Sequence, residues 1–220
     1  MKQVFVICEG FTEKVFVKEI LAPAISRTQF HAVFPGKPFN RQRGGNISYA
    51  RVKPDILATI KTDREHFCTT FFDYYALGRF PELIAEIPPR TPGERAALIE
   101  NAIEQDVAKE LGGGFNPNRF KAYLSMYEFE GLLFSDPARM ASGLYRPDLE
   151  PALREIRSKF PTPEHINDDR LTAPSKLLGR LIPGFDKVAA GNLAAMAVGV
   201  ETMKRECEHF REWFEWLSRI

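Results

Sequence analysis

Two acidic residues follow directly after a short apolar run near the N-terminus, and their spacing suits metal chemistry. Residues 3–8 read QVFVIC, a β-branched and aromatic run that predicts a buried strand. Glu9 and Glu13 come next, at the start of a helical pattern. In α/β folds, ligands bind outside the carboxyl ends of the strands, where these side chains would lie. Carboxylates so close together repel each other, and a hard divalent cation relieves that repulsion.

Three further carboxylates are expected at the same edge of the sheet. Asp73 closes a strand predicted at 67–73, and Glu128 and Glu130 follow a strand predicted at 119–126. Because the carboxyl ends of parallel strands share one edge, these acids can gather with the first pair in a single cleft. Oxygen ligands suit Mg²⁺ or Mn²⁺, and a paired-metal site can activate water and stabilise the leaving oxygen of a phosphodiester.

Each acid also has a simpler interpretation. Glu13 could be a helix-start residue favoured by the helix dipole, and Asp73 could belong to the turn that follows it. Glu128 and Glu130 could be surface acids or pair with Arg139. Two acids separated by one residue do not share a helix face, so only one of them is expected in the cluster unless the chain is extended there.

The elements that must position these residues alternate along the chain. Strands are predicted at 3–8, 30–34, 67–73 and 119–126, and helices at 12–21, 48–62 and 91–111. This order predicts an α/β fold with a mainly parallel four-stranded sheet and helices on both faces. Residues 1–126 are expected to form that core. Residues 127–220 are expected to form a helical C-terminal subdomain, or cap, packed on it.

Two segments offer contacts to a nucleic-acid backbone. Arg41 and Arg43 lie in a polar loop beside a Gly-Gly pair, and such a loop can hold phosphates by charge. Ser175 and Lys176 lie where Thr172 or Ser175 is expected to cap a helix, which would present N–H groups, a hydroxyl and a cation to a phosphate. Lys176 could neutralise charge that develops there. The alternatives are a solvated basic loop and a capped helix with an exposed lysine.

The composition is globular and gives no sign of a strongly basic nucleic-acid binder. The 220 residues are 44% hydrophobic and carry a net charge of +1, so any nucleic-acid contact must come from a local patch. Three cysteines without zinc-site spacing indicate a reducing cytoplasm. No apolar run approaches the ~20 residues that cross a bilayer, so no membrane contact is expected. Without a Walker motif, the chain alone is not expected to hydrolyse ATP.

Longer motifs resemble those of a prokaryotic family of unknown function that is related to the Toprim domain. The resemblance spans nearly the whole chain and is carried by six segments: Glu9–Glu13, Arg43–Ala50, Thr69–Tyr75, Tyr127–Pro137, Ile166–Lys176 and Pro183–Lys187. The ICEGFTE segment and the aspartate that closes the third strand also resemble the Toprim domain of topoisomerases, primases and overcoming-lysogenization-defect (OLD) nucleases.

The resemblance implies a Toprim-like, Rossmann-like fold and nuclease chemistry on DNA or RNA that depends on Mg²⁺ or Mn²⁺. It assigns Glu9 and Asp73 to catalysis and metal binding, and it makes Glu13 the second acid of the OLD type. The second position of the Toprim Asp-x-Asp pair is Tyr75 here, so that motif is incomplete.

The same resemblance suggests where the missing groups are. Glu128 or Glu130 would supply the absent carboxylate as a metal ligand. Lys176 would take the place of the basic residue that OLD-type nucleases hold near the phosphate, with catalytic and nucleic-acid-binding roles.

The resemblance also implies partners. Proteins of this family are often encoded beside an ATPase of the ABC or OLD type, in anti-phage defence or mobile loci. A partner or a second copy of the chain would help binding, because the overall charge is weak. The alternative function is a non-catalytic module that regulates such an ATPase. Phe210, Trp213 and Phe214 of the last predicted helix could dock on a partner, although core packing explains them equally well.

Overall fold

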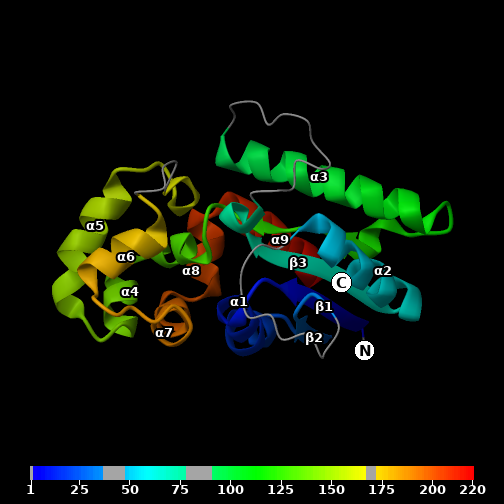
Figure 1. Ribbon diagram of the computed structural model, residues 1–220. Coiled ribbons are helices and arrows are strands. Elements are labelled where there is room, and N and C mark those ends of the chain that lie inside the picture. The colour runs from blue at the N-terminus through cyan, green and yellow to red at the C-terminus, as the bar shows by residue number, and fades with distance from the viewer. Residues whose placement is uncertain (1, 37–47, 78–90, 167–171) are drawn as a thin grey trace.

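In the part of the chain that the structure describes, five parallel strands form the sheet. The computed structural model describes residues 2–36, 48–77, 91–166 and 172–220 (Figure 1). The strands run in the order β2-β1-β3-β4, and β5 also pairs with β3. Their bounds are β1 Lys2–Cys8, β2 Thr28–Val33, β3 His66–Asp73, β4 Phe120–Lys121 and β5 Leu124–Ser125. The predicted α/β fold with a parallel sheet is confirmed.

The alternation of side chains along each strand gives the sheet two buried faces. In β1, Val4 and Val6 point to one core while Ile7 points to the other. In β3, Phe71 and Phe72 divide in the same way. Because side chains alternate with a period of two, a strand that is apolar on both faces must be covered on both.

Helices cover both faces, as predicted. On one face lie α1 (Phe11–Phe16), its π-helical continuation η1 (Val17–Leu21) and α9 (Glu208–Arg219). On the other lie α2 (Tyr49–Thr62) and α3 (Pro92–Leu111), which opens with a capping box at Thr91 and Glu94. Figure 1 shows α9 running behind β3. Phe210 and Trp213 of α9 are completely buried, so the core-packing interpretation is right and the docking one is wrong for them.

The strand order places a topological switch point between β1 and β3. The chain leaves β1 toward β2 on one side, then returns through α2 to β3 on the other side of β1. Connections that leave neighbouring strands toward opposite faces open a crevice at the carboxyl ends of those strands. Glu9 and Asp73 stand at these two ends.

The prediction of a single strand at 119–126 is wrong, because the structure has two short strands there. Between them, Tyr123 exchanges hydrogen bonds with a side chain rather than a strand backbone: its N–H donates to Thr70 Oγ1 at 2.9 Å, and that hydroxyl donates to Tyr123 O at 3.0 Å. The next N–H group also donates to a side chain: Leu124 N donates to Glu100 Oε1 at 2.7 Å. Side chains thus replace the ladder in this stretch.

The C-terminal part is mostly helical. After a 3₁₀-helix, η6 (Phe129–Ser135), it consists of α4 Pro137–Gly143, η7 Pro147–Leu149, α5 Glu150–Ser158, η8 Pro163–His165, α6 Pro174–Leu181, α7 Ala189–Val198 and α8 Val200–Glu206, followed by α9. In Figure 1, α4 to α8 lie on the side of the sheet where β1 leads into α1. The division at residue 126 stays a prediction; side chains from both parts share one core.

None of the helices in the described residues combines the length and the apolar character that crossing a membrane requires.

Candidate functional site

Glu9 and Asp73 meet at the carboxyl ends of β1 and β3. The two strands pair in parallel with Cys8 opposite Phe71, and Glu9 N donates to Phe71 O at 3.2 Å. One residue beyond the ladder, Glu9 Oε2 accepts a hydrogen bond from Asp73 N at 3.1 Å. The predicted convergence of these strand ends is therefore what the structure shows.

Glu13 turns back toward the same edge. Its Oε2 accepts a hydrogen bond from Gly10 N at 2.8 Å, and the residue is only 6% exposed. A Cβ on Gly10 would lie 3.2 Å from that oxygen, a tight contact, so a glycine lets the carboxylate close on the backbone. Glu13 thus has the helix-start role given as its alternative, and it also lies buried beside Glu9.

Asp73 brings a distant segment to the site. Its Oδ1 accepts a hydrogen bond from Phe129 N at 2.7 Å, which ties the end of β3 to the start of η6. The interpretation of Asp73 as a local turn acid is therefore wrong. The bond places the flanking acids Glu128 and Glu130 next to the strand ends.

Glu128 and Glu130 both turn inward. Their side chains are 15% and 1% exposed, so the surface interpretation is wrong. Arg139 forms its ion pair with Asp136, at 3.6 Å, and not with either glutamate. Glu128 has an extended backbone (φ −148°, ψ 150°), which is the condition under which both acids were expected to reach the cluster.

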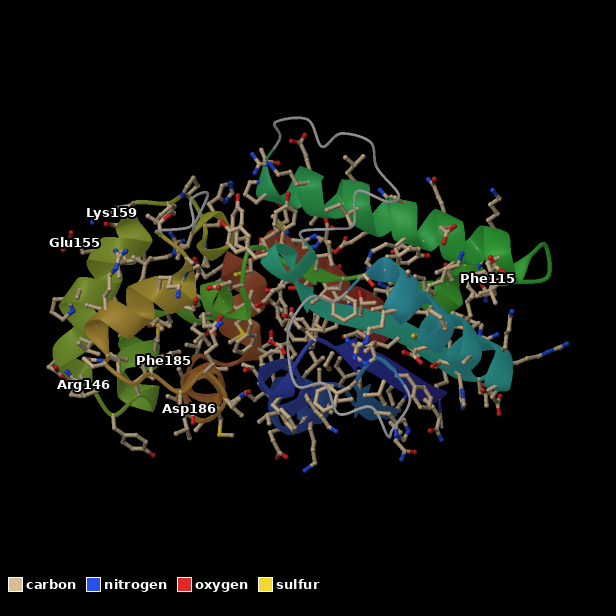
Figure 2. The ribbon with its side chains drawn as sticks, viewed as in Figure 1. Phe115, Arg146, Glu155, Lys159, Phe185 and Asp186 are labelled. Carbon is tan, nitrogen blue, oxygen red and sulfur yellow. The ribbon has the colours of Figure 1, made fainter. Side chains whose placement is uncertain are left out.

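Lys187 supplies a positive charge that the sequence analysis did not assign. Its Nζ lies 3.0 Å from Glu130 Oε1 and 3.9 Å from Glu128 Oε1. The preceding residue, labelled in Figure 2, fixes this segment, because Asp186 Oδ1 accepts hydrogen bonds from Val188 N and Ala189 N at the start of α7. The signal was present: the PGFDK segment was one of the six that carried the family resemblance, but it was given no role.

The start of α6 already holds an oxyanion of the same chain. Glu128 accepts hydrogen bonds from Ser175 N at 2.8 Å and Ser175 Oγ at 2.9 Å. The residue at the N-cap is Ala173, so the prediction that Thr172 or Ser175 caps this helix is wrong. A carboxylate from elsewhere takes that role, and a phosphate would bind there only if Glu128 moved away.

Three other residues were predicted at the site: Lys176, Arg41 and Arg43. Lys176 is exposed on α6 and forms no ion pair within the described parts of the chain. Arg41 and Arg43 lie outside the described residues.

Glu9, Glu13, Asp73 and Glu130, hereafter the carboxylate cluster, all have a raised pKa. Burial raises the pKa of Glu9 to about 7, with the Asp73 N–H opposing and Glu13 adding to the rise. Burial likewise raises the pKa of Glu13 and of Glu130. For Asp73, burial and then the nearby Glu13 and Glu9 raise the pKa well above its usual range. Lys187 opposes the rise in all four.

The donors suit a hard divalent cation, although they do not surround one point. Among the described residues, no three His, Cys, Asp or Glu side chains are grouped so that they could hold an ion as they stand. Glu13 and Asp73 face backbone N–H groups, and Glu130 faces Lys187. Glu130 Oε2 is nevertheless buried without a hydrogen bond, and Oε1 has the Lys187 ammonium at 3.0 Å as its partner. The oxygen chemistry fits Mg²⁺ or Mn²⁺, and binding requires rotation of these side chains.

Comparisons with known proteins place the chain in a family. Neither a comparison with curated proteins nor one with solved structures gave a significant match. A family model described as Domain of unknown function (DUF4276) matches residues 8–218, a range that contains the whole carboxylate cluster and Lys187. The chain therefore belongs to the DUF4276 family.

Proposed function

We propose that this protein is a Mg²⁺- or Mn²⁺-dependent hydrolase of phosphodiester bonds in DNA or RNA, with a Toprim-like active site. The observation that carries the proposal is the carboxylate cluster at the switch point of a parallel sheet. Buried carboxyls that raise one another's pKa are unfavourable for folding, and such groups gather at functional sites. Cations relieve the repulsion, and this edge is where α/β folds bind ligands.

Each residue of the cluster has a role in this proposal. Glu9 and Asp73, one from each strand end, would hold the metal, and Glu13 and Glu130 would complete one site or two. A metal bound there would polarise the phosphodiester and lower the pKa of a water. Glu130 would take the place that Tyr75 leaves vacant in the Asp-x-Asp motif.

Two residues outside the cluster would position it and its substrate. Glu128 links η6 to α6 through Ser175 and so fixes the direction in which Glu130 enters the site. Lys187 is 44% exposed, so its ammonium can contact both Glu130 and a bound phosphate. We assign the role of neutralising the phosphate charge to Lys187 rather than to Lys176, because Lys187 is the lysine that contacts the acids.

Metal-dependent cleavage of plasmid DNA and tRNA tests the proposal directly. Glu9→Gln and Asp73→Asn should each reduce the cleavage rate with Mg²⁺ or Mn²⁺ by about 100-fold or more. Mutation of residues that only hydrogen-bond to metal ligands already reduces metal affinity or activity by about 10- to 100-fold, and loss of a ligand should cost more. Glu104→Gln is the matched control: burial also raises the pKa of this α3 acid, but its Oε1 accepts a hydrogen bond from Ala122 N, away from the cluster. Cleavage that persists in both cluster variants would remove the site from consideration.

A second candidate is a non-catalytic module that binds a partner ATPase. Two observations favour it: the Asp-x-Asp motif is incomplete, and Val188, Leu193 and Met196 on or beside α7 expose apolar side chains. Calorimetric titration with Mn²⁺ separates the two functions. The hydrolase binds Mn²⁺ and loses most of that affinity in Glu9→Gln, whereas the module shows no binding that depends on these acids.

A further inference from the structure

Two exposed aromatic side chains lie beside the carboxylate cluster. Phe11 comes two residues after Glu9 and is 60% exposed, and Tyr75 comes two residues after Asp73 and is 38% exposed. Because β1 and β3 are neighbours, both residues follow the sheet edge at which Glu9 and Asp73 are hydrogen bonded. Large exposed aromatic rings beside a polar site are typical of recognition surfaces.

Other rings support both side chains from the protein side. The Tyr75 ring lies 5.5 Å from that of Tyr127 and 6.3 Å from that of Tyr74. The Phe11 ring meets that of Phe34 edge-on at 5.0 Å. A ring held in this way loses little conformational freedom when a ligand stacks on its outer face.

The backbone fixes the tyrosines to the site. Tyr75 N donates to Tyr127 O at 3.3 Å. Tyr127 is 2% exposed and has a φ of 62°, a left-handed conformation that is uncommon for a bulky side chain. The next residue, Glu128, leads into η6, so the same turn positions the tyrosine cluster and the acids.

We propose that Phe11 and Tyr75 stack on unpaired bases beside the phosphodiester that the carboxylate cluster acts on, so that the substrate is single-stranded nucleic acid. This inference rests on the proposed function and adds its substrate class. In a duplex the base faces are stacked on each other, so a protein ring reaches them only when the strand is unpaired. Stacking also supplies affinity that the weak net charge of +1 does not.

The burial of the neighbouring aromatics argues against a purely structural role for these two rings. Tyr127 and Trp213 are buried, as packing residues are, whereas Phe11 and Tyr75 are exposed. The aromatic at position 75 is also informative, because the Asp-x-Asp motif would place a carboxylate there. The ring thus replaces a metal ligand with a surface suited to a base.

Fluorescence anisotropy with labelled oligonucleotides tests the inference. Binding of a single-stranded thymidine or uridine oligomer is measured in EDTA, where no cleavage occurs, and compared with the matched duplex. Phe11→Ala and Tyr75→Ala should each weaken single-strand binding by about fivefold or more, since the loss of a stacking ring costs at least about that much. Tyr75→Phe, which keeps the ring, should bind like the wild type.

Tyr145→Ala is the control, because this tyrosine is 80% exposed and follows α4. It should leave binding unchanged, and circular dichroism should show that all variants are folded. Equal affinity for duplex and single strand, or alanine variants that bind as tightly as the wild type, would overturn the inference while metal-dependent cleavage still stood. A wild type that neither binds nor cuts nucleic acid would overturn the proposed function with it.

Discussion

Lys187 supplies the positive charge that the buried acids at the sheet edge share. Its Nζ lies 3.0 Å from Glu130 Oε1, and its charge opposes the rise in pKa of every member of the carboxylate cluster. Without it, the acids would have to remain protonated or bind another cation. A lysine in this position therefore stabilises the fold when no metal is bound.

Replacing this lysine tests the charge balance. Lys187→Met should lower the free energy of unfolding by about 1–2 kcal/mol at pH 8, less than for a fully buried pair because Lys187 is 44% exposed. The loss should be smaller at pH 5, where the acids with raised pKa are protonated. Added Mn²⁺ should raise the melting temperature of the variant more than that of the wild type, because the ion replaces the missing charge.

The control is a lysine in an ordinary surface pair. Lys159 contacts Glu155 at 2.8 Å on α5 and is 60% exposed (Figure 2). Lys159→Met should leave the stability close to that of the wild type and should not respond to Mn²⁺. If Lys187→Met shows the same small change at both pH values, the lysine does not compensate the acids.

At the scale of residues, the sequence placed the acids Glu9 and Asp73 at the site but did not place Lys187 there. Glu9 and Asp73 are set by strand ends, and a strand end can be read from an apolar run. Lys187 reaches the site only because α7 begins at the right place and Asp186 holds the connection from α6. Nothing local in the sequence states which way that connection turns.

At the scale of elements, the joint between η6 and α6 holds the acids in place. Glu128 satisfies Ser175 N and Ser175 Oγ, and α6 has no side-chain cap of its own. Glu128→Ala should lower the free energy of unfolding by about 1–2 kcal/mol, as the loss of a charged helix cap does. Urea unfolding monitored by circular dichroism measures this change.

A double-mutant cycle with Ser175→Ala separates the two bonds. Ser175→Ala removes the hydroxyl but keeps the N–H, so it should cost less than Glu128→Ala, and the two effects should not add. Additive losses would mean that the bond between the Ser175 hydroxyl and Glu128 does not contribute to stability.

The elements that were mispredicted share one cause. The apolar run at 119–126 predicts one strand, but Thr70, Glu100 and Glu104 take its central N–H groups, so the ladder breaks. Likewise α6 begins without its own cap because Glu128 supplies one from a distance. Propensity and capping patterns describe neighbours in sequence, and these partners lie tens of residues away. By contrast α3, with its cap and first turn in one motif, was predicted nearly to the residue.

At the scale of the whole molecule, one buried network joins elements from both faces of the sheet. Glu100 of α3 accepts from Leu124 N of β5, and its Oε1 lies 2.8 Å from His209 Nε2 of α9. Glu164 of η8 accepts from the first N–H groups of α9, at His209 and Phe210. The helix that covers one face is thus tied to the helix that covers the other.

This network should make the stability of the whole fold depend on pH. Burial alone would lower the pKa of His209, but the adjacent Glu100, with further contributions from Glu164 and Glu212, outweighs burial and raises it. A histidine whose folded pKa lies above its unfolded value of about 6.5 stabilises the fold fully below that pH, and the contribution is lost as pH rises through the folded pKa. At pH 6, His209→Gln should cost about 3 kcal/mol, because Glu100 is left as a buried charge without its partner.

The difference in unfolding free energy between the wild type and His209→Gln should therefore shrink as pH rises from 6 to 9. Tyr123 stacks on the imidazole at 5.3 Å, and the variant loses this contact at every pH, so the loss adds a constant to the difference and no pH dependence. His165 gives a control of opposite sign, because burial lowers its pKa and its effect on stability should appear only as pH falls below about 6.5. A difference for His209→Gln that stays constant from pH 6 to 9 would show that the His209 imidazole is neutral and that it forms no ion pair with Glu100.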